Sequence, residues 1–123
     1  MATLGARLSD VRAGEVVIEL PFREDLVQQH GFVHAGVVSS VTDSACGYAA
    51  LTLMDPGAAV LTVEFKINLL APAVGDSFRA VGRVVRAGRT LTVCLGELRA
   101  GDVLIAVMQA TMMTVAARDD RRD

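Results

Sequence analysis

The chain has 123 residues, a length typical of one domain, so we expect a single domain over residues 1–123 and not a two-domain enzyme. Hydrophobic residues make up 52% of the chain and charged residues 21%, with 12 basic residues against 14 acidic ones. This balance argues against a disordered chain, a polybasic arm and an acidic tail, so we expect neither DNA nor RNA as a partner.

The cysteines and the low-charge segments predict a cytoplasmic protein. Cys46 and Cys94 are too few for a disulfide scaffold and lack the CxxC spacing of a zinc or redox site, so we expect both to be reduced core residues. The first eight residues contain Arg7 and no apolar run of the kind that a secretory signal needs. Residues 31–54 are long enough to cross a bilayer, but their serines and Asp43 predict a buried helix instead, and no membrane partner is expected.

The first half of the chain predicts two strands and one long helix. Residues 15–22 have the pattern of a strand, which can pair with residues 5–11 across an Arg-Ala-Gly turn. The helix is expected over residues 34–54, where the breaker triplet Asp55-Pro56-Gly57 ends it. Its content of Ala, Ser, Gly and Val favours a helix packed closely on more than one side.

The second half of the chain predicts strands only. Residues 58–70 alternate with period two, and this pattern predicts a strand with one buried face. The expected buried side chains are Leu61, Val63, Phe65, Ile67 and Leu69. Strand patterns follow at residues 76–86, 90–98 and 103–115, separated by turn-prone segments, and the four strands predict an antiparallel meander. Residues 116–123 are expected to form a solvated, frayed tail.

These elements predict an α+β fold in which a strongly curved antiparallel sheet wraps around one long central helix. Asp43 is notable in that arrangement, because it is the one acidic residue in the middle of an apolar helix. Burying a carboxylate costs several kcal/mol unless it is paired. Asp43 therefore lies either on a narrow wet stripe with the neighbouring serines, or in a partly dry site as a general base or nucleophile.

The start of the helix is the second candidate feature. His34-Ala35-Gly36 contains no Ser, Thr, Asn or Asp to cap the first amides, which leaves them available as an oxyanion site unless water or the His34 ring caps them. Asp43 follows His34 by nine positions, about half a turn out of phase and ~13.5 Å along the helix axis. Both features can serve one substrate only if they come from two subunits, so we expect an obligate homodimer or a dimer of dimers.

The segment HGFVHAGVVSSVTD, residues 30–43, resembles the G-x-x-H-G-G-x(6)-D signature of the phenylacetate-degradation (PaaI-type) acyl-CoA thioesterases of the hot-dog fold. Residues 62–72 and 83–90 resemble the strands that follow in that family, and the resemblance runs over roughly residues 20–117. It implies a hydrolase that splits a thioester into a carboxylic acid and free coenzyme A. No metal is implied, and no cofactor beyond the coenzyme A of the substrate.

The resemblance also implies roles for five catalytic residues. The Ala35 backbone amide would bind the thioester carbonyl oxygen, and Asp43 would be the base that activates water or the nucleophile itself. Gln28 would help to position the substrate, and Thr62 would help to orient the water, although a solvated strand threonine is the simpler alternative for Thr62. His34 would order the helix start.

The substrate-binding residues suggested by the pattern are Gly36, Arg86, Gly88 and Arg89. Gly36 adjoins the oxyanion amide, while the arginines flank a turn where, together with Arg83, they can pair with coenzyme A phosphates unless they are ordinary surface charges. This family usually has Gly at the position of Ala35. A methyl group does not remove the backbone N–H, but it narrows the pocket.

Two other functions are compatible with the pattern. A hot-dog hydratase or dehydratase needs a histidine close to a carboxylate, for which only His34 or His30 is available. A non-catalytic acyl-CoA-binding module would keep the fold without turnover. Asp43 argues against the second alternative, because an apolar residue would bind the ligand at lower cost.

Overall fold

The computed structural model describes residues 5–26 and 33–116, in which six strands and one α-helix are found. The elements are β1 (Arg7–Arg12), β2 (Glu15–Pro21), the 3-10 turn η2 (Glu24–Leu26), α1 (Ala35–Leu51), β3 (Ala59–Leu69), β4 (Ser77–Ala87), β5 (Leu91–Ala100) and β6 (Val103–Val115). Each expected strand and the expected helix is present. The helix ends at Leu51, three residues before the expected end, and the expected tail lies outside the described residues except for Ala116.

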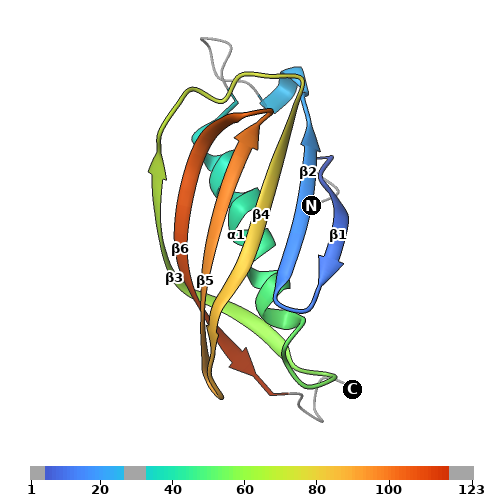
Figure 1. Ribbon diagram of the computed structural model, residues 1–123, viewed down its shortest axis with the longest axis vertical. Helices are drawn as coiled ribbons and strands as arrows, with labels where there is room; N and C mark the ends of the chain where they lie inside the picture. The colour runs from blue at the N-terminus through green and yellow to red at the C-terminus, as the bar shows by residue number, and fades with distance from the viewer. Residues whose placement is uncertain (1–4, 27–32, 117–123) are drawn as a thin grey trace.

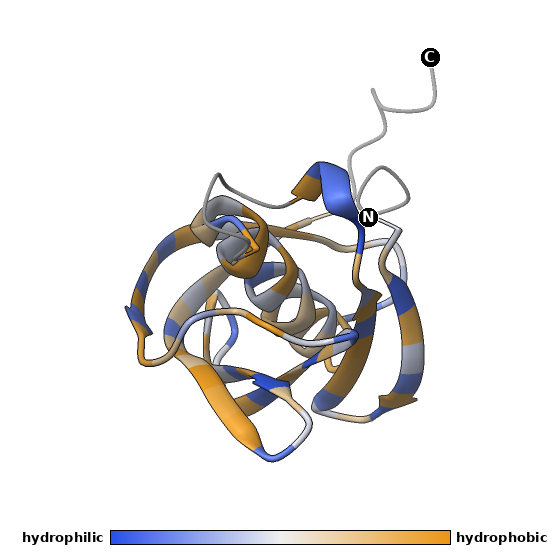
Figure 2. Cartoon of the chain, turned by 90° about the horizontal axis from the view of Figure 1, so that it is seen from above, coloured by the Kyte–Doolittle hydropathy of each residue, from blue (hydrophilic) through white to orange (hydrophobic). Residues whose placement is uncertain are grey.

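The strands form one antiparallel sheet in the order β1-β2-β4-β5-β6-β3. The sheet curves around α1, which packs against β2, β3, β4, β5 and β6 (Figures 1 and 2). The predicted α+β class, a curved antiparallel sheet around a central helix, is therefore confirmed. No helix in residues 5–26 and 33–116 has the length and apolar character needed to cross a membrane.

The predicted four-strand meander is wrong in one respect. β4, β5 and β6 do form a meander, but β3 pairs with β6 at the edge of the sheet instead of with β4. The connection between β3 and β4, residues 70–76, passes over the start of α1 and is called the crossing segment below (Figure 1). It is anchored there, since Ala73 O accepts the Val33 N–H at 3.0 Å and Asp76 O accepts the Phe22 N–H at 2.8 Å. β4 thus lies beside β2.

The predicted buried face of β3 is also wrong. Of its five apolar residues only Ile67 packs against the core, and the other four side chains are about half exposed: Leu61, Val63, Phe65 and Leu69. One reason is that β3 is an edge strand. The other is a bulge between Thr62 and Glu64, which reverses the alternation because it adds one residue to one strand of the pair.

The helix lies very close to the centre of the sheet, because two strands present glycine to it. A Cβ atom on Gly82 would lie 2.3 Å from the backbone carbonyl of Ala45. A Cβ atom on Gly96 would lie 2.8 Å from the Sγ atom of Cys46. The expected close packing of the helix is therefore present. Cys46 and Cys94 are both buried and unbridged, as expected.

Candidate active site

Asp43 lies in the third turn of α1 and is partly buried. Its Oδ1 atom accepts a hydrogen bond of 2.9 Å from the Thr62 hydroxyl of β3. The side chain of Thr62 lies on the helix side of the sheet, as does that of its cross-strand partner, the buried Met112. The bulge that follows Thr62 turns Glu64 to the opposite side. Thr62 is therefore not a solvated strand residue. Within the described residues no group donates to the second oxygen, Oδ2.

A cavity of about 240 Å³ lies beside this carboxylate. Its lining comes from the open face of α1 and from the start of β3, and consists of Asp43, Ser44, Gly47, Tyr48, Val60 and Thr62. The wall combines the Asp43 carboxylate with the hydroxyl-bearing side chains of Ser44, Tyr48 and Thr62 and with the smaller or apolar Gly47 and Val60. A partly buried carboxylate beside an open cavity is placed to take a proton from a water molecule or to attack an electrophilic carbon.

The helix start is capped by a histidine ring. His34 has extended backbone angles (φ −60°, ψ 139°), and its Nδ1 atom accepts the Gly36 N–H at 3.4 Å. The alternative in which the His34 ring caps an amide therefore holds for Gly36. The Ala35 N–H has no acceptor in residues 5–26 and 33–116, so it is the free donor of the first turn.

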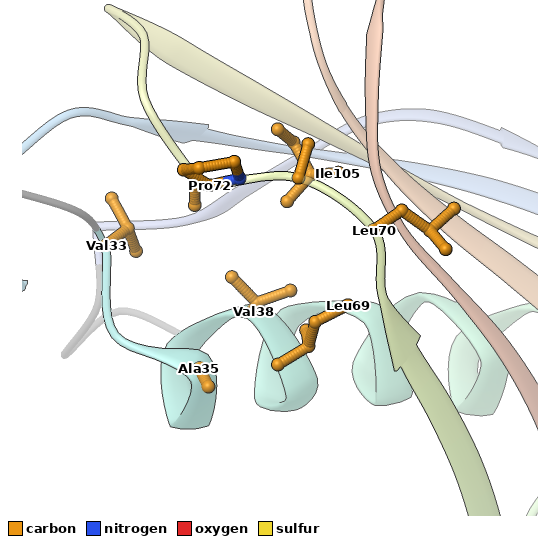
Figure 3. A pocket seen from close by; sticks show the side chains of 9 residues that line it. Val33, Ala35, Val38, Leu69, Leu70, Pro72 and Ile105 are labelled. Carbon is orange, nitrogen blue, oxygen red and sulfur yellow. The ribbon is translucent and has the colours of Figure 1, made fainter.

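Ala35 also lines a cavity of about 340 Å³ at the helix start (Figure 3). The side chains around it are apolar and come from the helix start, the end of β3, the crossing segment and β6. They include Val33, Val38, Leu69, Leu70, Pro72 and Ile105. The Ala35 N–H, which has no acceptor among the described residues, is therefore close to a surface that suits an apolar part of a ligand.

One chain does not bring the free amide and the carboxylate together. Eight positions separate Ala35 from Asp43, about 12 Å along the helix axis. The two residues line different cavities. Gln28 and His30 lie outside the described residues, so the expected substrate contact of Gln28 stays a prediction.

The turn between β4 and β5 contains the expected phosphate-binding residues. Arg86 and Arg89 are exposed and form no ion pair with the described residues, whereas Arg83 lies 3.9 Å from Glu15. Gly88 has a structural reason to be glycine, because a Cβ atom there would lie 2.6 Å from Leu91 O. Gly88 and Arg89 also line a cavity of about 340 Å³ near the end of α1.

The chain matches the thioesterase superfamily over residues 30–107, which cover the helix, β3, β4, β5 and part of β6. It belongs to that superfamily. A thioesterase family protein from Silicibacter pomeroyi has the same fold, with 52% identity and a TM-score of 0.93 over 95% of this chain and 89% of that one.

Two further relatives concern aromatic compounds. A phenylacetic acid degradation-related protein from Ralstonia eutropha is 25% identical, with a TM-score of 0.85 over 91% of this chain and 86% of that one. A 1,4-dihydroxy-2-naphthoyl-CoA hydrolase from Listeria monocytogenes is 23% identical over 98% of this chain and 96% of that protein. The sequence resemblance to hot-dog thioesterases is thus shown at the level of the superfamily.

The structure adds one residue that the sequence analysis missed in this thioesterase-superfamily chain. Tyr48 lines the cavity of Asp43 and is 39% exposed. Tyr48 follows Ser44, the neighbour of Asp43, by four positions, which is about one helical turn. This spacing places Tyr48 on the same face of the helix as Ser44. That spacing was visible in the sequence, but the face of the helix that the sheet leaves open was not.

The buried thiols do not supply a nucleophile. The pKa of the Cys46 thiol is raised from 9.0 to about 12. Burial is the largest cause of this rise, and the negative charges of Cys94 and Asp43 contribute the smaller part. Burial likewise raises the pKa of the Cys94 thiol to about 11. Because the thiolate is the reactive form of cysteine, neither side chain is reactive near neutral pH. Asp43 is the carboxylate that lines this cavity.

Proposed function

We propose that this protein is an acyl-CoA thioesterase of the PaaI type, with Asp43 as its catalytic carboxylate. The observation that carries the proposal is the Asp43 side chain, whose Oδ1 is held by Thr62 at 2.9 Å beside an open cavity. One oxygen is thereby oriented and the other is left for the reaction. A hydrolase that acts on a good leaving group such as a thiolate needs a base and an oxyanion donor, but no strong general acid.

The reaction follows from this arrangement. In the general-base form, Asp43 Oδ2 takes a proton from water while the water oxygen bonds to the thioester carbonyl carbon. The negative charge that develops on the carbonyl oxygen is stabilised by the Ala35 N–H and the helix dipole. The C–S bond then breaks, the thiolate leaves, and the proton returns to it or to solvent. In the nucleophilic form, Asp43 bonds to the carbonyl carbon, the C–S bond breaks and the thiolate leaves to take a proton from solvent. Water then hydrolyses the resulting anhydride, which releases the carboxylic acid and restores the Asp43 carboxylate.

The proposed site is completed by a second copy of the chain. Ala35 and Asp43 of one chain lie about 12 Å apart along the helix, too far to contact one carbonyl group. The edge strand β3 supports pairing of two copies, because it has eleven residues and exposes Leu61, Val63 and Phe65. An edge strand can pair with another strand, although the bulge and the exposed Glu64 and Lys66 partly protect this one, and a two-fold pairing would bring two copies of the helix into one assembly.

The substrate class rests on chemistry and on relatives. Arg86 and Arg89 provide free positive charge for the phosphates of coenzyme A. The names of the Listeria and Ralstonia proteins concern an aromatic acyl-CoA and phenylacetic acid. We infer an acyl-CoA ester as substrate. Within one chain the His34 ring caps Gly36 and lies over two turns from Asp43, so a hydratase site would likewise need the helix start of a second copy.

The experiment that tests the function measures thiol release from a panel of acyl-CoA esters. Asp43→Asn should fold with an unchanged melting temperature and lose kcat by two to four orders of magnitude, about the usual contribution of a general base. Asp102→Asn, an exposed acid in the turn before β6, is the matched control and should keep full activity. Full turnover by Asp43→Asn would remove Asp43 from the mechanism. Tight binding of the esters without any thiol release would favour a binding module.

A further inference from the structure

The Thr62 hydroxyl lies within hydrogen-bond distance of two acceptors. Its Oγ1 atom is 2.9 Å from Oδ1 of Asp43 and 3.2 Å from Sδ of Met112. A threonine hydroxyl carries one proton, and a thioether sulfur is a weak acceptor that carries none. The hydroxyl can therefore donate to the carboxylate or to the sulfur, and the proposed reaction so far uses only the first of these bonds.

The fold holds the Met112 sulfur in place beside this hydroxyl. Met112 is fully buried on β6, directly across from Thr62 of β3. It packs in a core cluster with Cys46 and Met108, and close packing of this kind leaves a flexible thioether little freedom. A leucine side chain would fill a similar volume without an acceptor atom. The sulfur is thus a polar atom at a position where packing alone requires none.

The charge on Asp43 decides which acceptor is the stronger one. A hydrogen bond to an ionised carboxylate is roughly twice as strong as one between neutral groups, so the Thr62 proton points to Oδ1 while Asp43 is charged. In the proposed reaction that charge is lost, either when Oδ2 takes a proton from water or when it bonds to the acyl carbon. Oδ1 is then a weaker, uncharged acceptor, and the sulfur becomes an alternative to it. Rotation about the Cβ–Oγ1 bond turns the proton from one acceptor to the other, and no heavy atom has to move.

We propose that Met112 is a positioning residue of the Asp43 site, whose sulfur accepts the Thr62 hydroxyl when Asp43 becomes uncharged. The inference rests on the proposed function and adds to it a group on the far side of Thr62 from the reacting carboxylate. Because the hydroxyl proton keeps an acceptor in both charge states, Thr62 stays in place through the reaction. The proton returns to Oδ1 when the carboxylate is restored.

The kinetic test is a double-mutant cycle between Met112 and Thr62. Met112→Leu should lower kcat for thiol release roughly threefold and leave KM unchanged, because a thioether is a weak acceptor. In the Thr62→Val background the same substitution should have no further effect. The matched control is Met108→Leu, since Met108 is 2% exposed in the same cluster and its cross-strand partners, Ile67 and Gly96, have no hydroxyl. It should leave kcat unchanged.

A spectroscopic test does not depend on turnover. In a protein with isotope-labelled methionine methyl groups, Asp43→Asn places an uncharged amide beside Thr62 at neutral pH. The methyl resonance of Met112 should then shift relative to the wild type, because the hydroxyl turns to the sulfur. The resonance of Met108 is the internal control and should stay in place. In the Thr62→Val background, Asp43→Asn should no longer shift the Met112 resonance.

Three outcomes would overturn the inference. The first is a loss of kcat in Met112→Leu that is equally large with and without the Thr62 hydroxyl, which would assign the effect to packing. The second is a Met112 resonance that Asp43→Asn does not move. The third is a shift of that resonance that persists in Thr62→Val, which would show a direct effect of the charge. If the wild-type protein releases no thiol, the proposed function has failed, and the methyl resonances still decide whether Met112 accepts the hydroxyl.

Discussion

The Thr62 hydroxyl donates a hydrogen bond of 2.9 Å to Oδ1 of Asp43, across 19 positions of sequence. This bond joins β3 to α1 and fixes the rotamer of a partly buried carboxylate. The contact exists because β3 has a bulge directly after Thr62. Without that extra residue, the side chains of Thr62 and Glu64 would point to the same face of the sheet.

Replacing the Thr62 hydroxyl should impair catalysis without unfolding the protein. Thr62→Val keeps the shape of the side chain but removes a hydrogen bond to a charged group, which is worth about 1.5–3 kcal/mol. We expect kcat for acyl-CoA hydrolysis to fall roughly tenfold to a hundredfold. Thr62→Ser restores the hydroxyl and should recover most of the rate. Equal rates for the valine and serine variants would show that the hydroxyl does not act on Asp43.

Mixed dimers should recover activity from two inactive variants if each site uses two chains. Ala35→Pro removes the free N–H at the first helical position, where proline is tolerated, and His34 already has the extended ψ of 139° that a following proline requires. Asp43→Asn removes the carboxylate. Refolded together, the two variants should form mixed dimers with one intact site and about half of the wild-type activity per mixed dimer. Mixed dimers verified by mass that stay inactive would contradict a shared site.

The arginines of the β4–β5 turn should affect coenzyme A recognition and not the chemical step. The double variant Arg86→Ala/Arg89→Ala should raise KM for a coenzyme A ester several-fold and change kcat little, because exposed charges bind phosphates at the rim of a site. For a short thioester that lacks the nucleotide, KM should be unchanged. The control is Arg83→Ala, since Arg83 lies near Glu15. An equal rise in KM for both thioesters would make Arg86 and Arg89 ordinary surface charges.

Two glycine substitutions should change stability in opposite directions. Gly82→Ala places a Cβ atom 2.3 Å from the Ala45 backbone, which has no flexible end that can move aside, so we expect a loss of about 3 kcal/mol or more. Gly47→Ala places its Cβ atom 3.9 Å from Val60 in the middle of α1, and should gain about 0.5–1 kcal/mol from helix propensity. Urea unfolding followed by circular dichroism measures both. A neutral Gly82→Ala would mean that the helix can move away from the sheet.

The buried thiols should make the protein less stable at alkaline pH. Burial raises the folded-state pKa of Cys46 from 9.0 to about 12, so folding favours the protonated thiol. The stability that this provides is complete below pH 9 and is lost as the pH rises toward 12. The melting temperature should fall over this window, and less steeply in Cys46→Ala than in the wild type. The same slope in both proteins would assign the loss to other groups.

The sequence by itself determined the elements and the fold class, because helix and strand periodicities are local properties of the chain. The alternation of residues 58–70 located β3, and the Asp55-Pro56-Gly57 triplet located the end of the helix to within a few residues. Asp43 was found in the same way, as an acid in an apolar helix. Its catalytic role, like the contact of Gln28, stays a prediction.

Only the tertiary structure decided what these elements face. Alternation along β3 shows that the strand has two different sides, but it does not say that the strand lies at the sheet edge or where a bulge reverses the sides. The direction of Thr62, the exposure of Phe65 and the position of Tyr48 beside the cavity of Asp43 all depend on those facts. Pairing and packing are contacts between segments far apart in sequence, and their energies are set by the whole fold and not by the local pattern.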